Sequence, residues 1–181
     1  TVALFGGDSR EGELEEGTHA DCIIVATIDN QTKEVKMVSV YRDTLTEQMN
    51  GEIKKANNAY FTGGPQDAIN MLNKNLDLDI QNYVTVDFKA LADTVDLLGG
   101  IGVDIKEEEV QYMNEFLEET AQVAGKEAKF IEHSGNQLLD GSQAVTYARI
   151  RSTAGGDYTR TERQRLVLAK IFDKVLHTKL G

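Results

Sequence analysis

Short apolar runs rich in β-branched residues alternate along this chain with longer segments whose apolar residues recur at helical spacing. Runs of the first kind are typical of strands, and spacings of three and four residues are typical of amphipathic helices. We expect strands at residues 1–7, 22–28, 34–42, 83–88 and 101–106. We expect helices at residues 63–76, 89–100, 107–125, 140–148 and 160–180. The series predicts one α/β or α+β domain over residues 1–181.

Length and charge exclude several classes of protein. With 181 residues, of which 40% are hydrophobic, the chain is long enough to bury a sizeable core. Its 19 basic and 30 acidic side chains give a net charge of −11, which excludes a broad basic face for nucleic acid. The sequence has no apolar run long enough to span a membrane and no signal-peptide pattern. Because it opens at Thr1, we expect an excised soluble portion of a longer protein.

Five of the seven arginines lie in one segment near the C-terminus. Thr159 and Glu162 have the spacing of a capping box, which predicts that the last helix begins at Arg160. Arg160, Arg163 and Gln164 would then share one face near the positive end of the helix dipole. Unpaired backbone N–H groups lie at the same place, so this helix start is predicted to attract an anion.

Arg149 and Arg151 precede that helix and are two residues apart. In extended chain their side chains point the same way, so we expect both to face the same pocket if the preceding helix ends near Tyr147. Arginine suits phosphate because its planar guanidinium forms two parallel hydrogen bonds and stays charged. On the residues alone an alternative stays open, in which the arginines form ion pairs with carboxylates such as Asp157.

Charged residues also follow the predicted strands near the N-terminus. Asp8 and Arg10 come just after the first strand, Asp21 just before the second, and Arg42 and Asp43 end the third. If these strands are neighbours, both aspartates and Arg42 reach one rim of the sheet, where ligands commonly bind. Two carboxylates opposite several arginines suit Mg²⁺ that bridges the aspartates to phosphate oxygens.

Seven short stretches, in this order, resemble the sequence pattern of the LytR-CpsA-Psr proteins of bacterial cell-wall assembly. They are "GGDSR", "AD", "YRDT", "KANNAYFTGG", "DTVDLLGGIGV", "YARIR" and "DYTRTERQ". Each stretch alone is a weak signal. Together they extend over nearly the whole chain, and their order makes the resemblance specific.

The resemblance implies a central mixed sheet flanked by helices, with an apolar groove for a polyprenyl chain. It implies a Mg²⁺-dependent enzyme that moves a phospho-linked glycopolymer, such as teichoic acid or capsular polysaccharide, from a polyprenyl pyrophosphate carrier to peptidoglycan. Such enzymes lie on the extracytoplasmic face of the cell membrane, usually tethered by an upstream helix that this chain lacks. The expected partners are therefore the lipid-linked glycan, peptidoglycan and the membrane, and no nucleic acid.

The same resemblance assigns roles to individual residues. Asp8 and Asp21 would hold Mg²⁺, and Arg42 would stabilise charge at the reacting phosphate. The resemblance identifies no base; Asp8 and Asp43 are candidates on the residues, but a carboxylate bound to magnesium is a poor base. Asp157 would position an arginine. The residues expected to bind or support the pyrophosphate are Arg10, Arg42, Lys55, Asn57, Arg149, Arg151, Arg160, Arg163 and Gln164.

Two positions depart from the family pattern. His19 stands where the family commonly has an arginine, and Tyr41 stands where it has a proline. The first change is expected to weaken a phosphate contact, and the second is expected to affect only the backbone. Neither removes the two aspartates, so we expect activity to survive.

Other functions use part of the same residues. A non-enzymatic phosphate-binding module would keep the arginines without needing paired aspartates, and a pyrophosphatase would use the same site with water as the acceptor. A set of apolar residues on predicted helices suits either the polyprenyl groove or an ordinary core, and we expect the core. These residues are Ile69, Leu72, Leu91, Val95 and Leu98.

Overall fold

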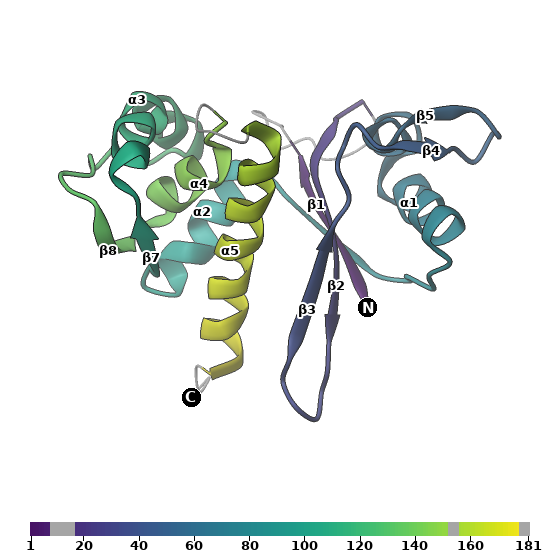
Figure 1. Ribbon diagram of the computed structural model, residues 1–181, viewed down its shortest axis with the longest axis horizontal. Helices are drawn as coiled ribbons and strands as arrows, with labels where there is room; N and C mark the ends of the chain where they lie inside the picture. The colour runs from purple at the N-terminus through teal and green to yellow at the C-terminus, as the bar shows by residue number, and fades with distance from the viewer. Residues whose placement is uncertain (8–16, 152–155, 178–181) are drawn as a thin grey trace. The chain divides into compact units, whose positions relative to one another are not determined.

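The computed structural model describes residues 1–7, 17–151 and 156–177, which form eight strands and five helices (Figure 1). The chain divides into two compact units, Thr1–Asp87 and Phe88–Gly181, and each is described by itself. None of the helices in these ranges is both long and apolar enough to cross a membrane.

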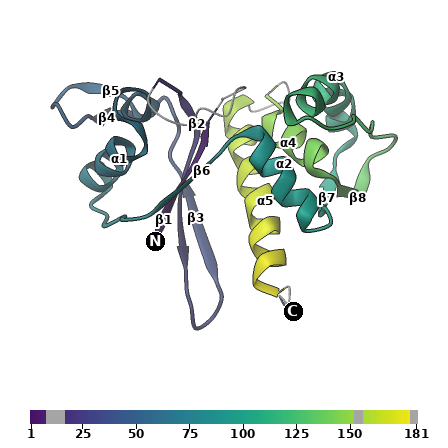
Figure 2. The ribbon, with the colours of Figure 1, turned by 180° about the vertical axis from the view of Figure 1, so that it is seen from behind.

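The first unit is built on a four-stranded mixed sheet with the order β3-β2-β1-β6. Its strands are β1 (Val2–Gly7), β2 (Ala20–Ile28), β3 (Val35–Ser39) and β6 (Tyr83–Val86). The pairs β1–β2 and β2–β3 are antiparallel, whereas β6 runs parallel to β1, beside which it lies in Figure 2. The α/β class with a mixed sheet is therefore confirmed. Because of these directions, the end of β1, the start of β2 and the end of β3 lie at one rim.

A small hairpin of β4 (Leu45–Glu47) and β5 (Ile53–Lys55) follows β3 and leads directly into α1 (Ala56–Leu76). Figure 1 shows the hairpin near the N-terminal end of this helix. The sequence did not predict the hairpin, because strands of three residues are too short for a period to appear. The helix predicted over residues 63–76 is found, but the sequence missed the helical segment before it, which begins at Ala56.

A kink in α1 explains that error. Gly63 and Gly64 have non-helical backbone, and Gly64 lies at φ 64° and ψ −161°, a region open almost only to glycine. Pro65 then restarts the helix, since proline fits the first helical turn without losing a backbone bond. The Gly-Gly-Pro sequence thus marks the bend in α1 and the start of its second helical segment.

The core of the first unit lies between α1 and the sheet. Phe5 of β1 meets Tyr60 of α1 edge to face, with ring centroids 5.2 Å apart, and Met71 is fully buried beside them. Ile69 and Leu72 are each 1% exposed in the same cluster, so both belong to the core, as expected.

The second unit packs three helices around a buried central helix, α4 (Gly141–Arg149), beside a two-stranded antiparallel sheet. Its other elements are α2 (Phe88–Leu97), β7 (Ile101–Ile105), α3 (Glu107–Ala124), β8 (Gly135–Leu139) and α5 (Gly156–His177). Val95 is buried in its core, and Leu91 and Leu98 pack against that core. The sequence missed β8, because "GNQLL" contains no β-branched residue and little alternation.

Helices α2 and α4 approach each other closely at Gly141. A Cβ atom at this position would lie 2.1 Å from the carbonyl oxygen of Ala92, a contact that only a backbone shift can relieve. We expect Gly141→Ala to lower the free energy of unfolding by about 1–3 kcal/mol, the usual cost of overpacking a core. Urea unfolding measures this loss. Gly102→Ala is the control, because nothing lies within 4 Å of its Cβ, and equal stability of the two variants would contradict the packing described.

Lys126 joins the end of α3 to α2 through Asp93 and Asp96, each with an N–O distance of 2.7 Å. The hydrogen bonds from Lys126 and then Lys89 lower the pKa of Asp93 from 3.8 to about 2. A lowered carboxyl pKa stabilises the fold above pH 3.8, and this contribution disappears as the pH falls through about 2. Lys126→Met should therefore lower the thermal midpoint at pH 6 but have little effect at pH 2. A difference that is independent of pH would contradict the ion pairs.

Candidate functional site

A turn after β3 is held against the start of α1 by backbone hydrogen bonds. Asn57 N donates to the carbonyl oxygen of Arg42 at 3.1 Å, and Ala56 N donates to that of Thr44 at 2.8 Å. The turn itself is closed by Thr44 N, which donates to the carbonyl oxygen of Tyr41. Side chains from the sheet rim and from the helix start are thereby brought to one place. The expected effect of tyrosine at position 41 on the backbone stays a prediction.

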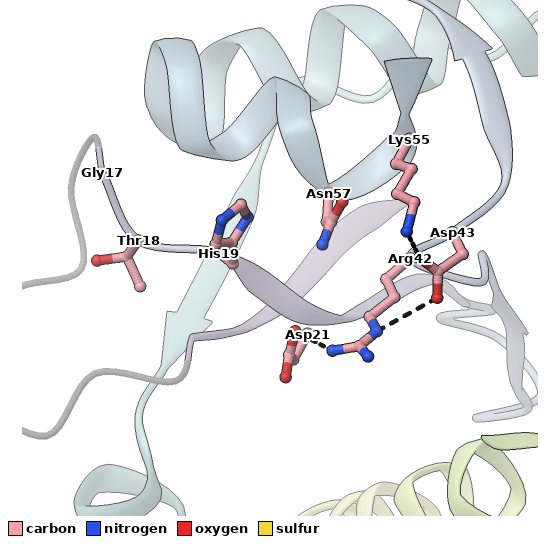
Figure 3. A pocket seen from close by; sticks show the side chains of 8 residues that line it. All are labelled: Gly17, Thr18, His19, Asp21, Arg42, Asp43, Lys55 and Asn57. Carbon is pink, nitrogen blue, oxygen red and sulfur yellow. Dashed lines mark hydrogen bonds and ion pairs between the residues drawn. The ribbon is translucent and has the colours of Figure 1, made fainter. Parts of the chain in front are cut away.

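These elements surround a pocket of about 430 Å³ in the first unit (Figure 3). Its lining residues include four that the sequence singled out for phosphate or metal binding, together with the candidate base Asp43 and His19. The described lining comprises Gly17, Thr18, His19, Asp21, Arg42, Asp43, Lys55 and Asn57. The prediction that Asp21 and Arg42 reach one rim of the sheet is confirmed, because Arg42 Nη1 lies 2.8 Å from Asp21 Oδ1.

Cations and anions alternate around this pocket. The guanidinium of Arg42 lies between Asp21 and Asp43, with its Nε 3.5 Å from Asp43 Oδ2, and Lys55 Nζ contacts the other oxygen of Asp43. The hydrogen bond from Lys55 lowers the pKa of Asp43 below its ordinary value, and the charges of Lys55 and Arg42 lower it further. Asp43 is therefore a weak proton acceptor and a strong anchor for the two cations.

His19 stacks on the ring of Phe61 at the edge of the pocket. The two ring centroids are 4.5 Å apart and the planes differ by 12°. Gly17 N donates to the carbonyl oxygen of Phe61, which fixes the segment before β2 against α1. The position that the family commonly gives to an arginine thus presents an aromatic surface.

Asp8 and Arg10 lie outside the described residues. Among the residues that the structure describes, no group of three or more histidine, cysteine, aspartate and glutamate side chains is arranged to hold a metal ion. Asp21 is the one predicted Mg²⁺ ligand within the described part, and its carboxylate is 26% exposed beside Arg42. A hard cation prefers oxygen ligands, so this carboxylate suits Mg²⁺ in its chemistry, and the magnesium site stays a prediction.

The remaining arginines lie in the second unit, on and near α4 and α5. The predicted start of the last helix at Arg160 was wrong, because α5 begins at Gly156. Thr159 Oγ1 donates back to the carbonyl oxygen of Gly156 at 3.0 Å, as a residue inside the first turn does. Asp157 provides the negative charge that favours this helix end. Arg160 therefore lies beyond the first turn.

Asp157 brings two of these arginines together. Its Oδ1 lies 3.2 Å from Arg160 Nη2 and 3.9 Å from Arg151 Nε. Arg149 has different partners, since its Nη1 donates to Thr120 Oγ1 at 2.7 Å and its guanidinium lies over the ring of Phe88. Gln164 is half-buried on α5.

Arg163 forms the most buried ion pair among the described residues. Its side chain is 6% exposed, and its Nε donates to Glu109 Oε1 at 2.8 Å, while Glu109 is 1% exposed. Arg163 Nη1 also donates to the carbonyl oxygen of Ile150. The sequence missed Glu109, because it lies in an acidic run that reads as the solvated start of a helix. Arg163 therefore forms a buried ion pair, which differs from the surface ion pairs of the alternative.

Comparison with known proteins places this chain. The model of the LytR_cpsA_psr family matches residues 1–180. The chain is 32% identical to the Bacillus subtilis polyisoprenyl-teichoic acid–peptidoglycan teichoic acid transferase TagV over 95% of its length and 43% of the relative's. It is 33% identical to the Enterococcus faecalis transferase TagU over 97% of its length and 54% of the relative's. It thus spans about half the length of these curated relatives.

A solved structure agrees with the sequence comparison. The LytR-CPS2A-psr family protein YwtF (TagT) with bound octaprenyl pyrophosphate lipid superposes with a TM-score of 0.75 at 26% identity. The match covers 98% of this chain and 65% of that one. The mixed α/β fold expected from the sequence is therefore the fold of these proteins.

Proposed function

The chain belongs to the LytR_cpsA_psr family, and we propose that it transfers a phospho-linked glycopolymer from a polyprenyl pyrophosphate carrier to peptidoglycan. The observation that carries this proposal is the pocket in which Arg42 and Lys55 lie beside Asp21, Asp43 and Asn57. A relative is named a teichoic acid transferase, and a similar fold binds octaprenyl pyrophosphate. The polymer that this protein transfers is proposed to be teichoic acid or another phosphate-linked saccharide.

Binding of the pyrophosphate relies on guanidinium groups. Arg42 presents a planar group that two phosphate oxygens can share, and Lys55 adds a second charge at the same pocket. Asp21 and Asp43 hold Arg42 in place before the substrate arrives, so little reorganisation is needed. Arg10, Arg149, Arg151 and Arg160 stay predictions as pyrophosphate ligands, whereas Arg163 is held by Glu109 inside the second unit.

The reaction is a phosphoryl transfer. A sugar hydroxyl of peptidoglycan forms a bond to the phosphorus that carries the glycopolymer, and the bridging P–O bond breaks. Polyprenyl phosphate leaves, and the hydroxyl proton passes to water or to the leaving phosphate. Magnesium, held by Asp8 and Asp21, would neutralise charge on the phosphates. Asp43 is proposed to position Arg42 and Lys55, because its lowered pKa makes it a poor base for the hydroxyl proton.

We also propose a location and a set of partners. The polyprenyl carrier and peptidoglycan meet at the outer face of the cell membrane, so we propose that this chain lies there. A further segment of the whole protein is proposed to hold it at the membrane.

Release of polyprenyl phosphate from a short-chain lipid pyrophosphoryl saccharide tests this function. With Mg²⁺ and a peptidoglycan fragment we expect release together with attachment of the saccharide to the fragment. Release that needs no fragment would instead identify a pyrophosphatase. Binding of the lipid without any release would identify a carrier-binding module.

A further inference from the structure

Two more pockets of the first unit adjoin the phosphate pocket. The first, of about 450 Å³, shares His19, Lys55 and Asn57 with it and adds Leu45. The second, of about 250 Å³, continues from there through Lys54 and Asn58. The three pockets therefore follow one another along the β4–β5 hairpin and the first half of α1. We name the two added pockets together the hairpin track.

Polar groups that line the hairpin track are available for a ligand. The side-chain amides of Asn57 and Asn58 and the carboxylate of Asp67 are half-buried and have no hydrogen-bond or ion-pair partner among the described residues. These polar atoms are open to solvent, so their donors and acceptors can exchange water for groups of a ligand. Neutral amides beside one carboxylate suit sugar hydroxyl and acetamido groups, which donate and accept in the same way.

Apolar side chains lie beside these polar groups. Leu45 is 70% exposed, Met49 is 50% exposed, and Phe61 is 40% exposed while it stacks on His19. Each pocket of the track includes such a group in its lining or stacked against it. Sugar rings carry an apolar C–H face and a polar edge, so aromatic and aliphatic surfaces next to amides match them.

The charges of the track decide which saccharide fits. Lys54 pairs with Glu52 at 2.8 Å, and Lys55 directs its charge to Asp43 at the phosphate pocket. Beyond the phosphate pocket, Asp67 adds a negative charge to the second pocket of the track. A polymer of phosphodiesters would be repelled there, whereas an uncharged chain of N-acetylated sugars would not.

We infer that the hairpin track binds the N-acetylated sugar chain of the peptidoglycan acceptor and leads its hydroxyl to the phosphate pocket. This inference rests on the proposed function for the identity of the acceptor. It places the acceptor on the side of Asn57 and Lys55, next to Asn58, Thr62 and Asp67.

The binding test uses a neutral probe, the β-1,4-linked tetramer of N-acetylglucosamine, titrated into the chain and followed by NMR. We expect Asn58→Ala and Asp67→Asn each to raise its Kd about fivefold, the effect of losing one hydrogen bond. Asn70→Ala is the matched control, since this asparagine of α1 already pairs with Gln66, and its Kd should stay within about twofold of the parent's.

Three results would overturn the inference: no binding of the tetramer, a Kd that neither variant changes, or tighter binding of a glycerol phosphate oligomer that Asn58→Ala weakens. Thermal melting of each variant shows whether it is folded. If the tetramer does not bind while transfer activity is intact, the sugar site at the hairpin track is wrong and the proposed function stands. If the tetramer binds through Asn58 but the protein has no transfer activity, the sugar site stands and the proposed function is wrong.

Discussion

Replacement of Arg42 by alanine is expected to reduce kcat/KM for the lipid donor by about 100- to 1,000-fold, the usual cost of removing one preorganised charge from a phosphate or oxyanion site. Arg42 carries this weight because its guanidinium lines the phosphate pocket and is held between two carboxylates. Without the guanidinium, the carboxylates of Asp21 and Asp43 would repel each other and the phosphate. Arg42→Lys should recover only part of the activity, since an ammonium group cannot form the bidentate contact.

The control for this prediction is Lys36→Ala. Lys36 lies on β3, the strand that leads to Arg42, and forms an exposed pair with Glu34 at 3.7 Å. Initial rates of polyprenyl phosphate release should be unchanged in this variant. If Arg42→Ala folds normally and turns over as fast as Lys36→Ala, the pocket is not the catalytic site.

Replacement of Glu109 by alanine should lower the free energy of unfolding by about 3–5 kcal/mol, because it leaves the buried guanidinium of Arg163 without its carboxylate. For a chain of this size that corresponds to a thermal midpoint lower by about 6–20 °C. Glu109 Oε2 also accepts a hydrogen bond from Lys106 N at 2.9 Å, so the variant loses this capping hydrogen bond at the start of α3 as well.

Glu108→Ala is the matched control, since the adjacent glutamate is exposed. Its midpoint should stay within about 2 °C of the parent's, as expected for a surface substitution. The double variant Glu109→Leu with Arg163→Met should regain much of the stability, because it removes both buried charges. Equal midpoints for the two glutamate variants would show that the pair does not stabilise the second unit.

Strands and helices with a clear period could be predicted from the sequence. The runs that became β1, β2, β3 and β6 alternate or are β-branched. The period failed where elements were short, as in the β4–β5 hairpin, or where glycine and proline bent a helix, as in α1. Thr159 misled because a threonine can also bond to backbone within a first turn.

The sequence predicted where the charged residues of the candidate site lie, but it did not predict which carboxylate pairs with which arginine. Asp21 and Arg42 could be placed at one rim, since antiparallel strands fix which ends meet. Glu109 could not be paired with Arg163, because the two are far apart in sequence and depend on how α3 and α5 pack. Asn58 and Phe61 carried no signal of their own, because their roles depend on the hairpin.

The proposed function is tested most directly by the fate of the phosphorus atom that carries the saccharide. A lipid pyrophosphoryl saccharide labelled with ³²P at that position is incubated with the protein, Mg²⁺ and a peptidoglycan fragment. A transferase places the label on the fragment and releases unlabelled polyprenyl phosphate, and this is the result we expect. Label that appears in a free saccharide phosphate, or that stays in the lipid, would contradict the transfer.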